Sequence, residues 1–223
     1  MKITYVRNSK FKIDPGFICT AIHVENSVKL TNEQISSLPN WFFQVIDYKT
    51  TSAIIGRIFS ENLAKETKSQ VNPIEKGHPD IIPINVKNVS EKILKNYPDG
   101  IEIKVTIGNV STNSKLVSGQ SRIDYLTGIS WQAHHREVKE LMGIIWDFDQ
   151  LPKKFPIISG VFYANNLKEE DWGRISGTTG RNTKVTAMLT SGKEKMGKGN
   201  IVIIDNKKYL EAYQKRLNFK LPK

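Results

Sequence analysis

Two carboxylates and a lysine stand in a pattern that could hold a metal ion and activate a water molecule. Glu102 and Lys104 lie in the run 101–107 (IEIKVTI), in which apolar and polar residues alternate strictly, and Asp80 precedes them after a proline. Alternation with a period of two predicts a half-buried strand, so Glu102 and Lys104 point to the same side. If Asp80 lies at the end of the neighbouring strand, the three side chains converge. Because Mg²⁺ prefers hard oxygen ligands, the pattern predicts a Mg²⁺ site with a lysine beside it.

A second aspartate competes with Asp80 as the partner of Glu102. The 21 residues from 81 to 101 separate Asp80 from Glu102, which is long for two adjacent strands. Asp99 also follows a proline and lies much closer to Glu102 along the chain. The dipeptide Asp99-Gly100 is typical of a turn, and it leaves too little chain for a separate strand. The pattern therefore favours Asp80 and leaves Asp99 as the alternative.

Three further groups are candidates for chemistry, and each has a plainer interpretation. Glu61 lies on a predicted helix ahead of Asp80, where it could equally be a solvent-facing acid. His78 stands beside Pro79 and could be an ordinary turn histidine. His134 and His135 are adjacent on a predicted helix, where neighbours point about 100° apart and cannot easily share a metal ion. No CxxC or HExxH motif supports them as zinc ligands.

The composition indicates a globular protein with a polyanionic partner. The net charge is +11, which favours nucleic acid over an anionic membrane surface because no basic amphipathic helix stands out. Hydrophobic residues make up 39% of the chain, which excludes general disorder. No run approaches the about 20 apolar residues of a membrane helix, and the N-terminus lacks a signal-peptide core. The single cysteine, Cys19, excludes a disulfide scaffold and fits a reducing cytoplasm.

The apolar patterning predicts an α/β fold with a mixed central β-sheet flanked by helices. The clearest helix spans 51–66, where an apolar stripe begins at Ile54 and Ser52 can cap the start. Helices that alternate with strands imply a sheet covered by helices, and one core is the simplest arrangement for 223 residues. The other predicted elements are β-like runs at 3–6 and 17–24, helices at 31–38, 130–141 and 207–217, a long loop at 108–128, and buried strands at 142–148 and 157–164.

Two polar segments are candidates for contact with nucleic acid. Residues 172–200 hold six Lys or Arg and one acid, among glycines and hydroxyl side chains. Glycine lets the backbone approach phosphates, and Arg can bind guanine through two hydrogen bonds. An ordinary basic surface loop is the alternative, and the GxxxxGK[ST] order of a nucleotide-binding loop is missing. The predicted contacts are Arg174, Arg181, Lys184 and Lys193 in this segment, with Gln120 and Arg122 in the loop before it.

Three features carry a resemblance to a known family: the predicted helix at 51–66 with Glu61, the pair Pro79-Asp80, and the triplet Glu102-Ile103-Lys104. Together they resemble the PD-(D/E)xK nuclease superfamily, and within it the type II restriction endonucleases. The resemblance covers residues 51–164 and implies a restriction-endonuclease-like core in a single domain. The flanks 1–50 and 165–223 would then make DNA or dimer contacts. The resemblance implies these roles: Asp80, Glu102 and the Ile103 carbonyl bind Mg²⁺, Lys104 orients or activates the water, and Glu61 completes a second metal site or its water shell.

The same resemblance implies sequence-specific cleavage of double-stranded DNA to 5′-phosphate and 3′-hydroxyl ends. A palindromic DNA site has twofold symmetry, which a homodimer matches. A cognate DNA methyltransferase is the expected genetic partner, and no membrane partner is expected. A structure-specific or repair nuclease of the superfamily is one alternative. A non-catalytic nucleic-acid-binding protein is the other, because it would explain the charge without the carboxylates.

Overall fold

The structure, a computed structural model, describes residues 3–75, 77–84, 86, 88–149, 155–177 and 184–219. The central strands are β1 (Tyr5–Arg7), β6 (Ile103–Thr106), β10 (Leu141–Phe148), β11 (Pro156–Ala164) and β14 (Asn200–Ile204). They form one five-stranded sheet in the order β1-β14-β11-β10-β6. β6 runs parallel to β10, and every other neighbouring pair is antiparallel. The predicted mixed sheet in an α/β fold is confirmed.

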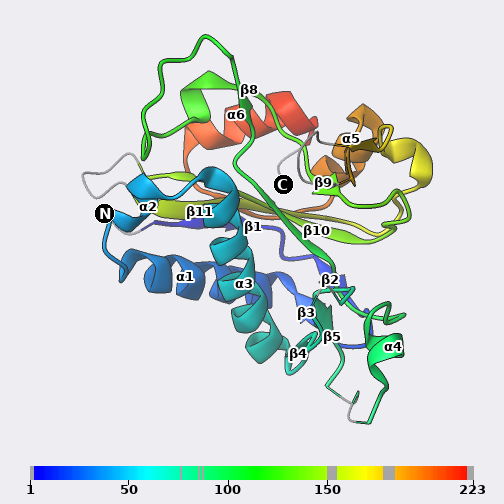
Figure 1. The fold of residues 1–223 in the computed structure, drawn as a ribbon. Helices are drawn as coiled ribbons and strands as arrows, with labels where there is room; N and C mark the ends of the chain where they lie inside the picture. The colour runs from blue at the N-terminus through cyan, green and yellow to red at the C-terminus, as the bar shows by residue number, and fades with distance from the viewer. Residues whose placement is uncertain are drawn as a thin grey trace.

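Helices cover both faces of this sheet (Figure 1). The α-helices of the described residues are α1 (Ala21–Ser36), α2 (Phe42–Val45), α3 (Tyr48–Thr67), α4 (Glu91–Leu94), α5 (Thr190–Lys198) and α6 (Lys207–Leu217). In β10, Met142, Ile144 and Trp146 enter the main core, which lies under α1 and α3. Leu141 and Ile145 enter a second core under α5 and α6. Because β10 is buried on both faces, it is an almost continuous apolar run.

Short strands surround the sheet and carry the region of Asp80. They are β2 (Lys12–Ile13), β3 (Cys19–Thr20), β4 (Gln70–Val71), β5 (Ile81–Ile82), β7 (Asn109–Val110), β8 (Leu126–Gly128), β9 (Gln132–Ala133), β12 (Ser176–Gly177) and β13 (Lys184–Ala187). β4 pairs with β5, and Ile81 of β5 exchanges two backbone hydrogen bonds with Ile101, at 3.1 and 2.8 Å. Ile81 enters the main core, whereas Ile82 joins Val86 and Leu94 in a separate small core.

Several predicted elements are confirmed at nearly the expected positions. The helix predicted over 51–66 lies within α3, the strands at 142–148 and 157–164 are β10 and β11, and the helix at 207–217 is α6. The start of α3 lies earlier than predicted. Its N-cap is Asp47, which accepts a hydrogen bond from the Thr50 N–H at 2.6 Å, in place of Ser52. A carboxylate is a stronger acceptor for the free N–H groups of a helix start.

The helix predicted over 130–141 is wrong. Turns and β9 occupy this segment, and β9 pairs with β13. The Trp131 side chain is buried against β10, and its indole N–H donates to the Ile144 carbonyl at 3.3 Å. It fits there because Gly143 has no side chain, since a Cβ would lie 2.5 Å from the Trp131 ring. Tertiary packing therefore outweighs the local helical pattern.

The N-terminal and basic segments also differ from expectation. The β-like run at 17–24 is only β3 followed by the first turn of α1, and the helix predicted at 31–38 is the end of α1. The basic segment after residue 172 contains β12, β13 and α5 rather than a loop. One glycine of this segment serves helix packing, because a Cβ on Gly197 would lie 2.0 Å from the Leu217 carbonyl oxygen. Gly197 allows α5 to lie directly against the end of α6.

A buried carboxylate ties the loop before β8 to the sheet and to α6. Asp147 of β10 is only 3% exposed. It accepts hydrogen bonds from the backbone N–H groups of Arg122 and Ile123, at 2.8 and 3.2 Å. The hydroxyls of Ser121 and Tyr209 also donate to it, at 2.7 and 3.1 Å. Burial raises the pKa of Asp147, although these donors oppose the shift.

The structure also describes the single cysteine and the apolar character of the helices. Cys19 is buried in the main core. Within the described ranges, no helix has both the length and the apolar character needed to cross a membrane.

Candidate functional site

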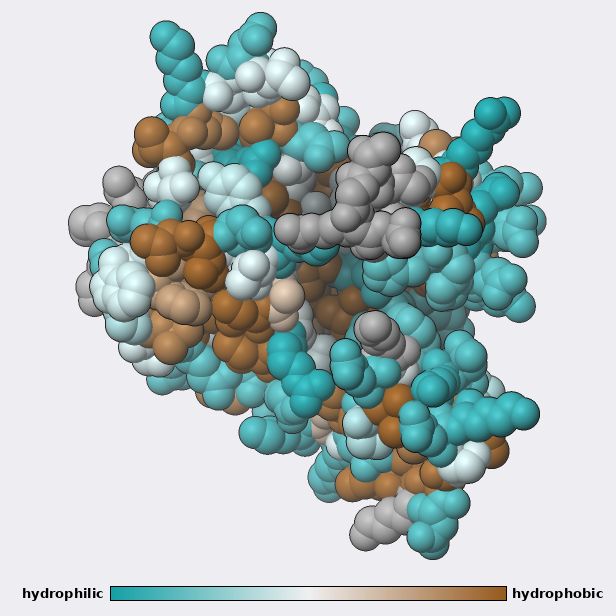
Figure 2. All heavy atoms as spheres, viewed as in Figure 1, coloured by the Kyte–Doolittle hydropathy of each residue, from teal (hydrophilic) through white to brown (hydrophobic). Residues whose placement is uncertain are grey.

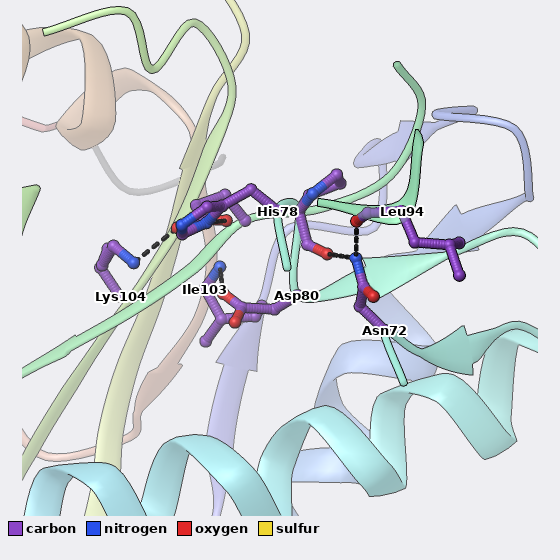
Figure 3. A network of polar contacts seen from close by, with 8 residues as sticks. Asn72, His78, Asp80, Leu94, Ile103 and Lys104 are labelled. Atoms are coloured by element: carbon purple, nitrogen blue, oxygen red, sulfur yellow. Dashed lines mark hydrogen bonds and ion pairs between the residues drawn. The ribbon is translucent and has the colours of Figure 1, made fainter. Parts of the chain in front are cut away.

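The structure brings Asp80 together with Glu102 and Lys104 at the edge of the sheet (Figure 3). The Lys104 ammonium donates to Glu102 Oε1 at 2.5 Å. The Ile103 N–H donates to Asp80 Oδ2 at 2.7 Å, which fixes the aspartate against the start of β6. Glu102 is 7% exposed, so this ion pair is shielded from water. The two carboxylates and the lysine therefore form one compact group.

Asp99 lies apart from this group. It is exposed in the turn that ends at Gly100. The pairing of Ile81 with Ile101 brings Asp80, and not Asp99, beside the start of β6. The geometry favours Asp80 as the partner of Glu102.

The turn at Gly100 is what allows that pairing, and it gives a first prediction. Gly100 has a φ of +136°, and a Cβ there would lie 2.1 Å from the Ile81 carbonyl oxygen. We expect Gly100→Ala to separate Ile81 from Ile101 and to lower the free energy of unfolding by about 1–3 kcal/mol. Urea denaturation measures this change. Gly128→Ala is the matched control, because the nearest atom to its Cβ would be 3.9 Å away. An equal loss of stability in both variants would contradict the role of Gly100 in the pairing of Ile81 with Ile101.

His78 joins Asp80, Glu102 and Lys104 and contacts the Glu102 carboxylate. Its Nδ1 lies 3.2 and 3.1 Å from the two carboxylate oxygens. The hydrogen bond to Glu102 raises the pKa of His78, in spite of partial burial. The ring of His135 meets the His78 ring edge to face, with centroids 5.9 Å apart. We refer to His78, Asp80, Glu102 and Lys104 as the site cluster.

The two carboxyl groups of the site cluster have pKa values shifted in opposite directions. Burial and then the charge of Glu102 raise the pKa of Asp80 to about 6. Burial also disfavours the charge on Glu102, but hydrogen bonds and charges from His78 and Lys104 outweigh it and lower the pKa of Glu102. The carboxylates of Asp80 and Glu102 likewise raise the pKa of Lys104 against the effect of its burial. A further cation beside Asp80 would therefore be stabilised at neutral pH.

The raised pKa of Asp80 predicts a pH-dependent cost to the fold. The folded value of about 6 exceeds the usual 3.8, so ionisation of Asp80 destabilises the protein as pH rises through this range. We expect Asp80→Asn to raise the metal-free free energy of unfolding by about 1–3 kcal/mol at pH 7. The gain should vanish near pH 4, where Asp80 is protonated. Urea titrations across this range measure it. A variant less stable than the wild type at pH 7 would contradict the prediction.

A cleft of about 840 Å³ opens beside the site cluster, between α3, β6, β9 and β13 (Figure 2). Asp80, Ile103 and Lys104 belong to its lining. Its other basic side chains are Lys49, Arg57 and His134. Among the described residues, the lining of the cleft is thus predominantly basic, with Asp80 as its carboxylate.

Glu61 lies away from the cleft. Its carboxylate pairs with Arg57 at 2.7 Å and is 44% exposed. It lines a neighbouring hollow of about 580 Å³ that Asp80 does not line. The structure therefore places the predicted acidic helix residue outside the site cluster, because the face of α3 turned to the cleft carries Arg57 and not Glu61.

The loop residues predicted to contact DNA are not part of the cleft lining either. Arg122 is only 9% exposed, and its guanidinium lies over the Tyr48 ring at 5.0 Å. Gln120 is half-buried, and its side chain accepts a hydrogen bond from the Val117 N–H at 3.4 Å. Arg122 thus serves to pack the loop on α3.

The predicted DNA contacts that the structure describes in the segment 172–200 do not line the cleft. Lys193 lies on α5, none of whose residues lines the cleft. Arg174 and Lys184 are exposed, and Lys184 precedes Val185 of the cleft wall. Arg181 lies outside the described residues.

Two cations of the cleft were missed by sequence reasoning. Lys49 and Arg57 lie eight positions apart on α3, with Ala53 midway between them. Residues four apart share a helix face, so these three positions mark a face opposite the apolar stripe. That pattern could have been found once the helix was extended back to Tyr48.

Comparisons with known proteins give no further guide to the site. No protein-family model, curated protein or solved structure matches the chain. The geometry and charge of the site are the basis for a functional conclusion.

Proposed function

We propose that this protein is a Mg²⁺-dependent endodeoxyribonuclease with a restriction-endonuclease-like core, acting as a type II restriction enzyme on double-stranded DNA. The carrying observation is the meeting of Asp80, Glu102 and Lys104 beside a basic cleft that Asp80 and Lys104 line. A net charge of +11 supports a polyanionic substrate. A cytoplasmic location and a homodimer on palindromic DNA belong to the same proposal, as does a cognate methyltransferase.

The carboxylates of the site cluster fit Mg²⁺. No three His, Cys, Asp or Glu groups of the described residues form a ready metal site. Mg²⁺, however, commonly uses one or two carboxylates and completes its shell with waters and substrate phosphates. Asp80, Glu102 and the Ile103 carbonyl would hold it. When bound, it would lower the pKa of a water and neutralise charge on the scissile phosphate.

The chain's own residues supply positioning and charge. Lys104 is held beside Glu102, where its ammonium would orient the attacking water and stabilise negative charge on the phosphate. His78 also holds the carboxylate of Glu102, through contacts with both of its oxygens. The Ile103 N–H fixes Asp80. These contacts keep the reacting groups in place before substrate arrives, which lowers the entropy cost of reaction.

Plasmid digestion tests the proposal. Purified protein with Mg²⁺ should convert plasmid DNA into discrete fragments with 5′-phosphate ends. Ragged products would instead indicate the structure-specific or repair nuclease of the same superfamily. Uncut plasmid with both Mg²⁺ and Mn²⁺, under conditions where the folded protein binds DNA, would refute a nuclease.

One observation favours a second candidate, a non-catalytic nucleic-acid-binding protein. Glu102 already has protein partners, His78 and Lys104, on its carboxylate. For this candidate, nucleic-acid binding should be unchanged by EDTA and by Asp80→Ala. Fluorescence anisotropy with labelled duplex measures both effects.

A further inference from the structure

We propose that the cleft-lining face of α3 binds the sugar–phosphate backbone of the substrate strand, with Lys49 and Arg57 as phosphate contacts. This inference rests on the proposed function for the identity of the polyanion as DNA. It assigns the contact surface to a helix outside both basic segments that the sequence singled out.

One face of α3 lines the cleft along more than half of the helix. Its lining residues are Tyr48, Lys49, Ser52, Ala53, Gly56, Arg57 and Ser60. Their spacings of one, three and four residues place them on a single helix face. Lys49 lies near the start of this face and Arg57 near its end, and the lining residues between them, Ser52, Ala53 and Gly56, have small side chains. A polyanion can therefore approach the helix closely between the two charges.

The cations have a spacing suited to one nucleic-acid strand. Eight helical residues rise about 12 Å, whereas one strand of a duplex carries a phosphate about every 3.4 Å along its axis. Lys49 and Arg57 can thus reach phosphates a few nucleotides apart. Lys104 lies in the same cleft. The three cations therefore surround a path that leads to the site cluster.

The ion pair of Arg57 does not prevent phosphate binding. Its partner Glu61 is 44% exposed and Arg57 itself is 63% exposed. Exposed ion pairs of this kind contribute little to stability. A phosphate can accept two parallel hydrogen bonds from the guanidinium. Substrate can therefore replace Glu61 as the partner of Arg57.

The wall opposite α3 is formed by β9, β13 and neighbouring residues. Its side chains differ in charge from those of α3, and this difference orients the strand. Its polar lining residues include Asn109, Ser130, Gln132 and His134, and none of its described lining residues is a lysine or arginine. Neutral amides and hydroxyls can donate to and accept from base edges. Phosphates are then favoured on the α3 side and bases on the other. Gly56 keeps the α3 wall in place, since its Cβ would come within 3.0 Å of Val105 in β6.

Charge-removing variants on α3 test the assignment. Lys49→Gln and Arg57→Gln should each weaken binding of a labelled 20-base-pair duplex about threefold to tenfold, whatever its sequence. Each should also reduce the slope of log affinity against log salt by about 0.9. Fluorescence anisotropy in EDTA measures binding without cleavage. Lys65→Gln is the matched control, because it removes the same charge from the same helix outside the cleft lining.

The outcomes separate this inference from the proposed function. Lys49 and Arg57 variants that bind no more weakly than Lys65→Gln would overturn the assignment, even if the protein cuts DNA. The expected losses in a protein that never cuts DNA would support the α3 surface and reject the nuclease. A wild-type protein that binds no duplex would overturn both. Far-UV CD melting of each variant checks that it is folded.

Discussion

Lys104→Ala should lower the single-turnover rate of Mg²⁺-dependent DNA cleavage by about 10²–10⁴-fold. The Lys104 ammonium lies 2.5 Å from Glu102 and lines the cleft, so it would face both the metal site and the phosphate. No other lysine lies in the site cluster, as far as the described residues show. A group that positions water and stabilises charge acts mainly in the transition state. Its loss should therefore reduce the rate of chemistry far more than DNA affinity.

Affinity and folding controls distinguish this role from a structural one. In EDTA, Lys104→Ala should weaken duplex binding no more than Lys49→Gln does. Lys65→Ala should cut at the wild-type rate, because Lys65 is exposed on α3 outside the cleft. A Lys104→Ala protein that is folded and cuts within threefold of the wild-type rate would remove the lysine from the mechanism.

Asp147→Ala should lower the free energy of unfolding by about 3–5 kcal/mol. Its carboxylate accepts from two backbone N–H groups and two hydroxyls that belong to the loop before β8 and to α6. Alanine would remove the acceptor of the buried backbone N–H groups of Arg122 and Ile123. An unsatisfied buried donor costs about 1–3 kcal/mol. Part of this loss is offset because the buried charge of Asp147 is removed as well.

Urea denaturation against a matched aspartate measures the effect. Asp124→Ala is the control, since Asp124 is half-exposed and pairs with Lys208 at 2.9 Å on the surface. A surface pair of this kind contributes about 0–1 kcal/mol. An Asp147→Ala variant as stable as Asp124→Ala would show that the donors find other partners.

The sequence predicted the parts of the site that depend on short-range periodicity. Strict alternation around Glu102 placed its side chain beside Lys104, and the structure has these two groups in contact. The choice between Asp80 and Asp99 depended on which segment pairs with residue 101. That pairing is non-local, but the turn chemistry of Asp99-Gly100 already pointed to Asp80.

Features that depend on packing across the sheet could not be predicted in this way. The segment at 130–141 has helical spacing, but the burial of Trp131 against Gly143 holds it extended. Arg122 resembles a surface cation in the sequence, although its position over Tyr48 buries it. The basic segment drew attention by its composition, whereas Lys49 and Arg57, two of the cations of the cleft, lie on an otherwise ordinary helix.

The site cluster draws its residues from regions of unequal size. Glu102 and Lys104 belong to the edge of the large sheet, while His78 and Asp80 come from the stretch that contains the small core. A unit with few buried apolar contacts opens locally at a lower free energy than a large core. In mild denaturant the two halves of the cluster would therefore separate while the sheet is still intact. Resistance of the activity to heat would then depend on the small core, so mutations that enlarge it could broaden the working range without touching a site residue.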